Sequence, residues 1–311
     1  MLLLLLYFLV LVVGHSNTCL KDSSVALETP LPTKSPRWAV ICLARFKKND
    51  LNQRNKALAV KLAPYVKDRE VDIIFFSENV ATPLMKATHK KQFANMNVKV
   101  KYMNTAHLAF KGKPNRGFGY KYMCKFFAID VFDMLNAAGY DYYLRCDTDC
   151  IIDTLDYDIF TWTEKHKVEY AYSARKLEAH KPTRETIVPF VQKYMQNCGI
   201  EPASLLGYPI SKAFNFYNNF HIGATAFFLR EDVQHFLQAV NNSGQIWENR
   251  WGDSTIQAYA VRLFAKEDRI KFVPQFAYVH GSHSNRKIST ANGGKDTDLP
   301  QKLPPHEVPE E

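Results

Sequence analysis

Runs of consecutive apolar residues alternate with helix-patterned segments along this chain, and this alternation restricts its fold more than any other feature. Trp38–Ala44 and Val71–Phe76 are apolar with almost no interruption, as expected of strands covered by helices on both faces. The segment Asn52–Val66 between them has the spacing of an amphipathic helix. The alternation therefore predicts an α/β fold with a single mixed, mostly parallel sheet covered by helices.

Later segments continue this pattern to the end of the body. We expect strands at Val98–Met103, Tyr142–Cys146, Glu169–Ser173, Phe220–Phe228 and Ile270–Val279, and helices at Gly119–Leu135, Thr186–Met195, Glu231–Val240 and Asp253–Phe264. Gly139 is suited to end the first of these helices in a left-handed cap. A chain of 311 residues can bury such a core in one large domain or two modest ones.

Composition excludes several other classes of protein. With 13% aromatic and 23% charged residues, the chain is not a disordered, collagen-like or coiled-coil protein. No apolar run reaches the roughly 18 to 20 residues of a comfortable membrane-spanning helix, so a polytopic membrane protein is excluded. No short period recurs either, which excludes a solenoid.

The charge of the chain is unevenly distributed. The formal charge is +9, and the acidic tail beyond residue 295 holds five acids and one lysine, so the rest carries about +13. A positive field of this size attracts phosphate groups. The basic residues are scattered, and Lys90-Lys91 and Lys111–Arg116 are their densest groups. This favours a groove for a nucleoside diphosphate over a nucleic-acid partner.

The N-terminus predicts entry into the secretory pathway. Residues 1–16 contain the apolar run Met1–Val13 and are expected to be a signal peptide or a short anchor that attaches the chain to a membrane. Residues 17–37 would form a stem, 38–284 a catalytic domain, and 285–311 a mobile tail rich in Pro and acids. Six cysteines allow disulfides that the sequence cannot pair, and Asn241 begins a glycosylation acceptor. A Golgi lumenal or secreted protein is expected.

The sequence Asp147-Thr148-Asp149 is the sharpest chemical motif, because it directly follows an apolar strand. Two carboxylates at this spacing can converge on one hard cation and on the phosphates that the cation bridges. Ligands of open α/β sheets also bind at such strand ends. The motif therefore predicts a Mn²⁺ or Mg²⁺ site for a nucleotide-sugar. An ordinary loop with solvated aspartates would have the same sequence pattern.

Two later segments add candidate ligands. Glu248 and Arg250 lie between two tryptophans, and Asp253 follows at the start of a helix, where it could also act as an N-cap. Aromatic faces next to a carboxylate and a guanidinium are common in sugar and phosphate sites. His280 ends the last expected strand and could complete the metal site. Arg145 and the Lys111–Arg116 segment are candidate diphosphate contacts.

Taken together, these segments resemble the fungal alpha-1,2-mannosyltransferases of the Kre2/Mnt1 type, glycosyltransferase family 15. The resemblance spans residues 38 to 283, and its most specific motif is Arg250-Trp251-Gly252-Asp253. The matching segments are Tyr120–Phe126, Tyr142–Asp149, Asn218–Gly223, Glu248–Ser254 and Tyr278–His280.

The resemblance implies a type A nucleotide-diphospho-sugar transferase (GT-A) fold. It also implies a retaining transfer of mannose from GDP-mannose to a mannoside acceptor on a glycoprotein or glycolipid, with Mn²⁺. By position, Asp147, Asp149 and His280 would bind the metal. Donor contacts would come from Arg145, Asp147, Asp149, Tyr120, Lys121 and Arg250, and catalytic residues from Asp253, His221, Glu248 and Tyr120.

One departure affects the mechanism. His221 stands where the family has a glutamate proposed as nucleophile, and an imidazole does not easily form the same glycosyl ester. Asp253 or Glu248 could assist instead, attack could occur on the front face without a covalent intermediate, or the chain could be inactive. A transferase of this fold that uses a UDP-sugar and a secreted, non-catalytic carbohydrate-binding protein are the alternatives.

Overall fold

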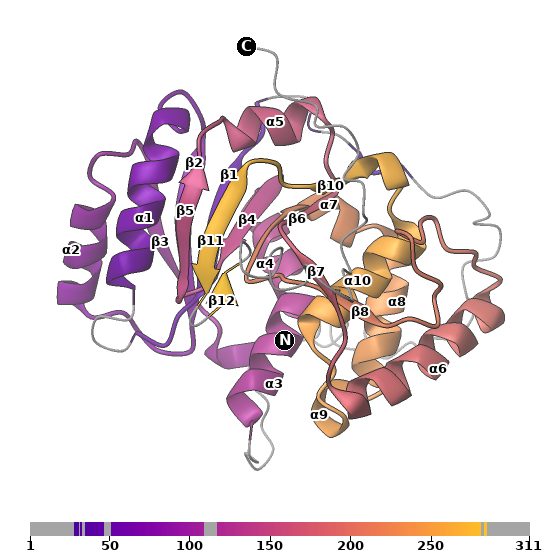
Figure 1. Cartoon of the computed structure of the whole chain (residues 1–311). Coiled ribbons are helices and arrows are strands. Elements are labelled where there is room, and N and C mark those ends of the chain that lie inside the picture. The colour runs from indigo at the N-terminus through magenta and orange to yellow at the C-terminus, as the bar shows by residue number, and fades with distance from the viewer. Residues whose placement is uncertain are drawn as a thin grey trace, which may run out of the picture.

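The structure, a computed structural model, describes residues 28–30, 32, 35–46, 51–108 and 117–280, together with the backbone of 283 and 284 (Figure 1). The expected leader 1–16, the Lys111–Arg116 segment and the tail 285–311 lie outside the described residues. Most of the expected stem, 17–37, lies outside them as well.

A seven-stranded sheet of order β10-β6-β9-β4-β1-β2-β3 forms the centre of the molecule. Its strands are β1 (Trp38–Leu43), β2 (Val71–Ser77), β3 (Lys99–Asn104), β4 (Tyr142–Cys146), β6 (Tyr170–Tyr172), β9 (Phe220–Ala224) and β10 (Ile270–Phe272). All neighbouring strands run parallel except β9, which is antiparallel to both β4 and β6. The main sheet is thus mixed and mostly parallel, as predicted.

Two small sheets accompany the main one. β5 (Cys150–Leu155), β11 (Phe276–His280) and β12 (His283–Ser284) form an antiparallel sheet, and β7 (Arg175–Leu177) pairs with β8 (Phe214–Phe216). In the first of them, His280 of β11 is the register partner of Cys150 in β5. The end of the described chain is thereby placed beside the turn that follows β4.

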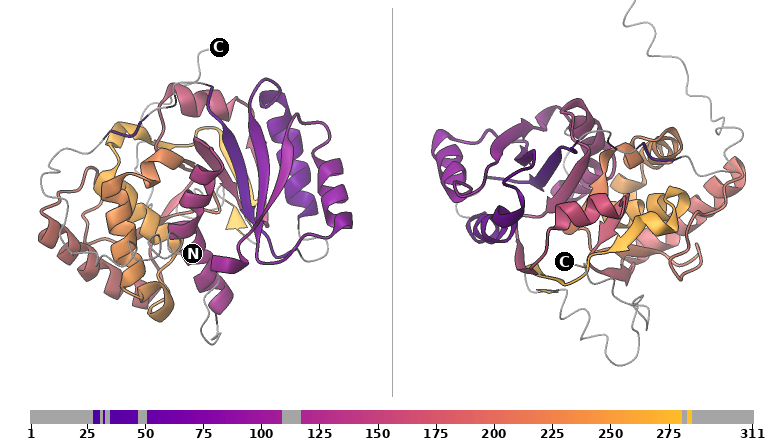
Figure 2. Two further views of the ribbon diagram at one scale, coloured as in Figure 1. Left: turned by 180° about the vertical axis from the view of Figure 1, so that it is seen from behind. Right: turned by 90° about the horizontal axis from the view of Figure 1, so that it is seen from above.

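Helices cover both faces of the main sheet. In Figure 1, α1 and α2 lie on one face of β1 to β3, and the view from behind shows α3 and α4 on the other face (Figure 2). The α-helices are α1 (Asn52–Leu62), α2 (Pro83–Gln92), α3 (Phe118–Lys125), α4 (Val131–Ala137), α5 (Ile159–Lys165), α6 (Lys181–Cys198), α7 (Thr225–Phe228), α8 (Glu231–Asn242), α9 (Gln245–Glu248) and α10 (Asp253–Phe264). Among the described helices, none has the length and apolarity needed to cross a membrane.

Shorter helical turns complete the described chain. They are the 3-10 turns η1 (Ala63–Tyr65), η2 (Ala106–Leu108) and η4 (Glu267–Arg269) and the π-helical segment η3 (Phe126–Asp130). The segment η3 joins α3 to α4, so the one helix expected at Gly119–Leu135 contains a widened turn. Gly139 follows α4 with a φ of 73°, the left-handed conformation expected of it.

Two expected strands end earlier than their runs of apolar residues suggest. The run Phe220–Phe228 divides into β9 and α7, and Ile270–Val279 divides into β10 and β11, which belong to different sheets. Apolar runs cannot distinguish one long strand from two buried elements. The second division matters for function, because only β11 leads to His280.

Close packing between β4 and β9 fixes the centre of the sheet. Tyr143 and Gly223 are register partners, and a Cβ built on Gly223 would lie 2.5 Å from the Tyr143 ring and hydroxyl. Any larger residue at this position would displace the buried tyrosine.

The cysteines divide into two kinds. Cys198 is disulfide-bonded, whereas the other cysteines of the described residues are free and buried: Cys42, Cys124, Cys146 and Cys150. A disulfide is consistent with maturation in an oxidising compartment.

Candidate active site

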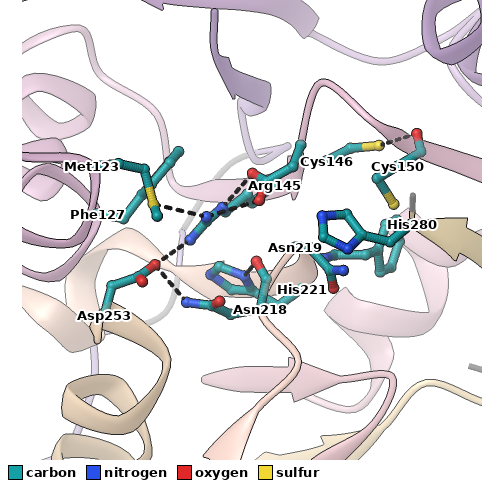
Figure 3. A network of polar contacts seen from close by, with 12 residues as sticks. Met123, Phe127, Arg145, Cys146, Cys150, Asn218, Asn219, His221, Asp253 and His280 are labelled. Atoms are coloured by element: carbon teal, nitrogen blue, oxygen red, sulfur yellow. Dashed lines mark hydrogen bonds and ion pairs between the residues drawn. The ribbon is translucent and has the colours of Figure 1, made fainter. Parts of the chain in front are cut away.

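The chemistry-bearing residues gather where the parallel strands β1, β2 and β4 end. Because parallel strands share their carboxyl edge, Arg45 after β1 and Asp147 after β4 lie at the same side of the sheet. The β5–β11 pair brings His280 to this edge. We call this set of strand ends the carboxyl edge, and Figure 3 shows its polar network.

Asp149 and His280 form an ion pair at the carboxyl edge. The Nε2 atom of His280 lies 3.1 Å from Oδ1 of Asp149, and the side chains are 32% and 57% exposed. The hydrogen bond from His280 lowers the pKa of the Asp149 carboxyl, and the same bond raises the pKa of the imidazole. Each group favours the charged form of the other, and both remain open to a ligand.

Arg145 is the centre of the network in Figure 3, and it is fully buried. Its Nε and Nη2 atoms donate to the two carboxylate oxygens of Asp147 at 2.7 and 3.0 Å, and Nη1 donates to Oδ2 of Asp253 at 2.6 Å. Nη2 also points to the Met123 sulfur at 3.6 Å. These contacts correct the expectation of a diphosphate contact at Arg145, because the guanidinium has no exposed surface to offer.

The Asp147 carboxylate is turned toward Arg145. Burial raises its pKa, and the neighbouring guanidinium opposes that rise. In the described part of the chain, no group of three or more His, Cys, Asp or Glu side chains is arranged to hold a metal. The three side chains expected to bind a metal therefore do not converge as a group: Asp149 and His280 form an ion pair, and Asp147 is held beside it by Arg145.

Asp253 lies on the other side of Arg145, in the first turn of α10. Gly252 takes the N-cap position, and no side-chain capping bond is formed, so the alternative role as an N-cap does not apply. The Oδ2 atom accepts from Arg145 and also from Asn218 at 2.7 Å. The carboxylate is thus fixed by a cation and an amide, and only 3% of the residue is exposed.

The π-helical turn η3 supplies the floor under Arg145. The ring of Phe127 lies 3.5 Å from the guanidinium carbon, and its backbone carbonyl accepts from Gln257 of α10 at 3.0 Å. Cation–π contacts gain strength when they are desolvated, as this one is. The extra residue of a π turn often marks a functional position, and here it joins two helices of the network.

His221 is placed in the core. It is the register partner of Arg145 across β4 and β9, is 0% exposed, and stacks on Tyr170. Its Nδ1 atom lies 2.8 Å from the Asn218 carbonyl oxygen, and Nε2 lies 3.2 Å from the Tyr143 hydroxyl. Burial and the nearby guanidinium of Arg145 lower its pKa to about 3. This corrects the expected catalytic role, because the neutral ring has no access to a substrate.

The remaining predicted residues form an outer wall built by α3 and α9. The Arg250 guanidinium lies 4.1 Å over the Tyr120 ring, and the Lys121 ammonium donates to the Trp247 carbonyl. Glu248 is exposed and accepts from Gln245 at 2.9 Å. The Tyr120 hydroxyl lies 3.5 Å from a Cβ built on Gly252, the residue before Asp253. In the described part of the chain, no hydrogen bond joins Glu248 to the Arg145–Asp253 network, and Glu248 pairs with Gln245 instead.

Two further residues of the carboxyl edge lie outside the set predicted as ligands or catalysts, although Asn219 belongs to the matching segment Asn218–Gly223. Asn219 accepts the Asp147 amide on its backbone oxygen at 2.9 Å, and its Oδ1 accepts from Tyr278 at 2.7 Å. Arg45 is exposed, and its guanidinium lies against Gly119 at the start of α3. Its position directly after β1 is the only feature that could have indicated it.

The Asp149–His280 pair fits a divalent cation. A carboxylate oxygen and an imidazole nitrogen are both ligands that Mn²⁺ accepts. Two protein ligands leave further positions for the oxygens of a diphosphate.

Similar structures confirm the fold. The Mn/GDP form of core-mannan synthase A from Aspergillus fumigatus has a TM-score of 0.66 at 17% identity, with 84% of this chain and 78% of that chain covered. The mannosyltransferase Ktr4p from S. cerevisiae has a TM-score of 0.67 at 16% identity, with 80% and 72% covered. These likenesses support the GT-A type fold expected from the sequence.

Relatives with curated names are mannosyltransferases. Glycolipid 2-alpha-mannosyltransferase 1 of Candida albicans is 28% identical over 175 residues, which cover 53% of this chain and 40% of the relative. An O-glycoside alpha-1,2-mannosyltransferase of Schizosaccharomyces pombe is 25% identical over 186 residues, 57% of this chain and 47% of the relative. The matches thus span less than half the length of these relatives.

The family model described as glycolipid 2-alpha-mannosyltransferase matches residues 89–290. This range contains Asp147, Asp149, Asp253 and His280 and covers well over half of the chain. The chain therefore belongs to the glycolipid 2-alpha-mannosyltransferase family, glycosyltransferase family 15.

Proposed function

We propose that this protein is a metal-dependent mannosyltransferase of the secretory pathway that transfers mannose from GDP-mannose to a mannoside acceptor on a glycoprotein or glycolipid. The observation that carries the proposal is the Asp149–His280 pair, which lies beside the Asp147–Arg145–Asp253 network at the carboxyl edge. The names of the relatives support mannose as the sugar and alpha-1,2 as the linkage. The Mn/GDP form of a similar structure supports the donor.

Asp149 and His280 would hold Mn²⁺ or Mg²⁺. When bound, the ion would offset the negative charge that builds on the nucleoside diphosphate as the sugar departs. Arg45 is the exposed cation closest in sequence to the end of β1, and we assign it to the diphosphate in place of Arg145. Arg250, which is exposed over Tyr120, is a second cation for the same substrate.

Arg145 acts as a positioning residue. Its bonds to Asp147 and Asp253 fix two carboxylates from different elements in one orientation. Preorganised charges of this kind are effective because they need no rearrangement during the reaction. Asp253 is itself buried and bonded to Arg145 and Asn218, so we propose that it holds this network in place beside Tyr120.

The surroundings of His221 bear on the stereochemical course. A double displacement needs an accessible nucleophile, and His221 is buried with both ring nitrogens engaged. Asp253 is already bonded to Arg145 and Asn218, and Glu248 lies outside the network. We therefore propose retention by front-face attack, without a sugar–enzyme ester.

The proposed function is tested by measuring GDP release from GDP-mannose by the purified protein, with manganese present or chelated and with a mannoside acceptor added. Metal-stimulated release that increases with the acceptor is expected. Release of nucleoside diphosphate only from UDP-sugars would show that the donor is a UDP-sugar and not GDP-mannose. Glycan binding without release from any nucleotide-sugar would identify a non-catalytic carbohydrate-binding protein.

A further inference from the structure

Two buried cysteines bracket the acidic motif. β4 ends at Cys146 and β5 begins at Cys150, so the turn between them consists of Asp147, Thr148 and Asp149. Both cysteines are free and 0% exposed, and Figure 3 shows them side by side. The Sγ atom of Cys146 donates to the Cys150 carbonyl at 3.5 Å.

The turn holds its two ends close together. The Cys150 amide donates to the Asp147 carbonyl at 3.1 Å, and Arg54 fixes the Cys146 carbonyl with two hydrogen bonds of 3.2 and 2.9 Å. Disulfides require Cα atoms about 4.4 to 6.8 Å apart, and the hydrogen bonds that close this turn keep its two cysteines near one another. Cys198 shows that this chain acquires disulfides.

We propose that Cys146 and Cys150 are a modification site at which a low-molecular-weight disulfide closes an intramolecular disulfide across the acidic turn. One protein thiol, after losing its proton, attacks a sulfur of the small disulfide and releases one small thiol. The second protein thiol then attacks the mixed disulfide and releases the other. The protein loses two protons and two electrons, and the small disulfide is reduced to two thiols.

Closure of this bridge would weaken metal binding, a consequence that rests on the proposed function. Cys150 is the register partner of His280, and Asp149 directly precedes Cys150. Moving Cys150 toward Cys146 therefore shifts Asp149 relative to His280. Because both thiols are buried, the oxidant reaches them only when the turn opens, so a bound divalent ion slows the reaction.

The experiment uses the full chain, reduced and then incubated with oxidised glutathione, with and without manganese. Free thiols are alkylated, and tryptic peptides are identified by mass spectrometry. Cys146 and Cys150 share the peptide Cys146–Lys165, whereas Cys42 lies in Trp38–Arg45. We expect Cys146–Lys165 to escape alkylation at both cysteines, Cys42 to remain alkylated, and manganese to slow the change.

Two variants distinguish the Cys146–Cys150 pair from the neighbouring thiol of Cys42. Cys150→Ser should abolish the disulfide, and Cys42→Ser, which removes the free thiol of the adjacent strand β1, should leave it intact. Full alkylation of wild-type Cys146 and Cys150 after prolonged incubation would overturn the proposal, as would a link between Cys146 and Cys42. The wild-type result is decisive even where a variant does not fold.

Manganese affinity is measured on the reduced and oxidised wild-type protein, and a loss of about tenfold or more is expected on oxidation. Equal manganese affinity in the two forms would refute the coupling between the disulfide and metal binding at the carboxyl edge. A reduced protein that binds no manganese would contradict the proposed function instead and would leave the peptide result unaffected.

Discussion

Two histidines at neighbouring places in this fold have opposite surroundings. His280 is partly exposed at the carboxyl edge, and Asp149 raises its pKa, whereas His221 is buried in β9 with a pKa of about 3. The guanidinium of Arg145 disfavours a charge on both rings. The difference therefore comes from the carboxylate partner and the solvent that only His280 has.

The comparison extends to the regions around the two rings. At the carboxyl edge, Asp149 and His280 contact one another and are both partly exposed to solvent. In the core around His221, each polar atom of the ring meets one protein partner. Substitutions at the edge should change activity with little effect on stability, and substitutions in the core should do the reverse.

The largest expected effect is that of Asp149→Ala. Losing a metal ligand removes several kcal/mol of charge stabilisation, so metal-stimulated GDP release should fall roughly a thousandfold, about 4 kcal/mol. The melting temperature should change little, because the side chain is 57% exposed. Asp268→Asn, an exposed acid of η4, is the matched control. Near-normal release by the Asp149 variant would refute the metal assignment.

The second prediction concerns the core. His221→Ala leaves a cavity and removes the partners of Asn218 and Tyr143, which should lower the free energy of unfolding by about 3 kcal/mol. Urea denaturation measures this loss. GDP release per folded molecule should stay within about threefold of the wild type. A variant with normal stability and no activity would restore His221 as a catalytic residue.

The third prediction is a pH dependence of stability. The unfolded His221 has its ordinary pKa of 6.5, and the folded one about 3, so the unfolded state binds more protons between these values. Stability should therefore fall as the pH decreases below about 6.5, by up to about 1.4 kcal/mol per pH unit. Compared with His221→Gln, the wild type should lose about 2 kcal/mol more between pH 7 and about pH 5. Parallel losses in both proteins would show that His221 titrates normally.

The smallest effect is expected from Arg45→Ala. Removing one exposed phosphate contact should raise the KM for the nucleotide-sugar about tenfold and leave kcat and the melting temperature nearly unchanged. Lys90→Ala, an exposed lysine of α2, is the control and should have no effect. An unchanged KM in the Arg45 variant would remove this residue from the donor site.

Local patterns predicted most of the fold. The apolar runs that became β1, β2 and β4 and the periodic segment that became α10 carry their own structural signal. The division between β10 and β11 depends on which sheet each joins, and that is decided by tertiary packing. The pairing of β11 with β5, which brings His280 to Asp149, is likewise a long-range contact.

The sequence indicated most residues of the candidate site but not what each of them contacts. Asp149 and His280 were selected for their position after strands, and they do meet. Arg145 was expected to contact a ligand because arginine suits phosphate, but the depth of a strand-end side chain depends on the neighbouring helices that cover it. Arg45 has no motif around it, so only the assembled sheet reveals its position.

Because a protein is synthesised from its N-terminus, β5 is made long before β11, the strand with which it pairs. Asp149 leaves the ribosome long before His280, and the two meet only after β11 has aligned with β5. A partly made chain can assemble much of its parallel sheet and still lack the His280 half of the Asp149–His280 pair. The Asp149–His280 pair is therefore one of the last parts of this edge to form, after the final strands have docked.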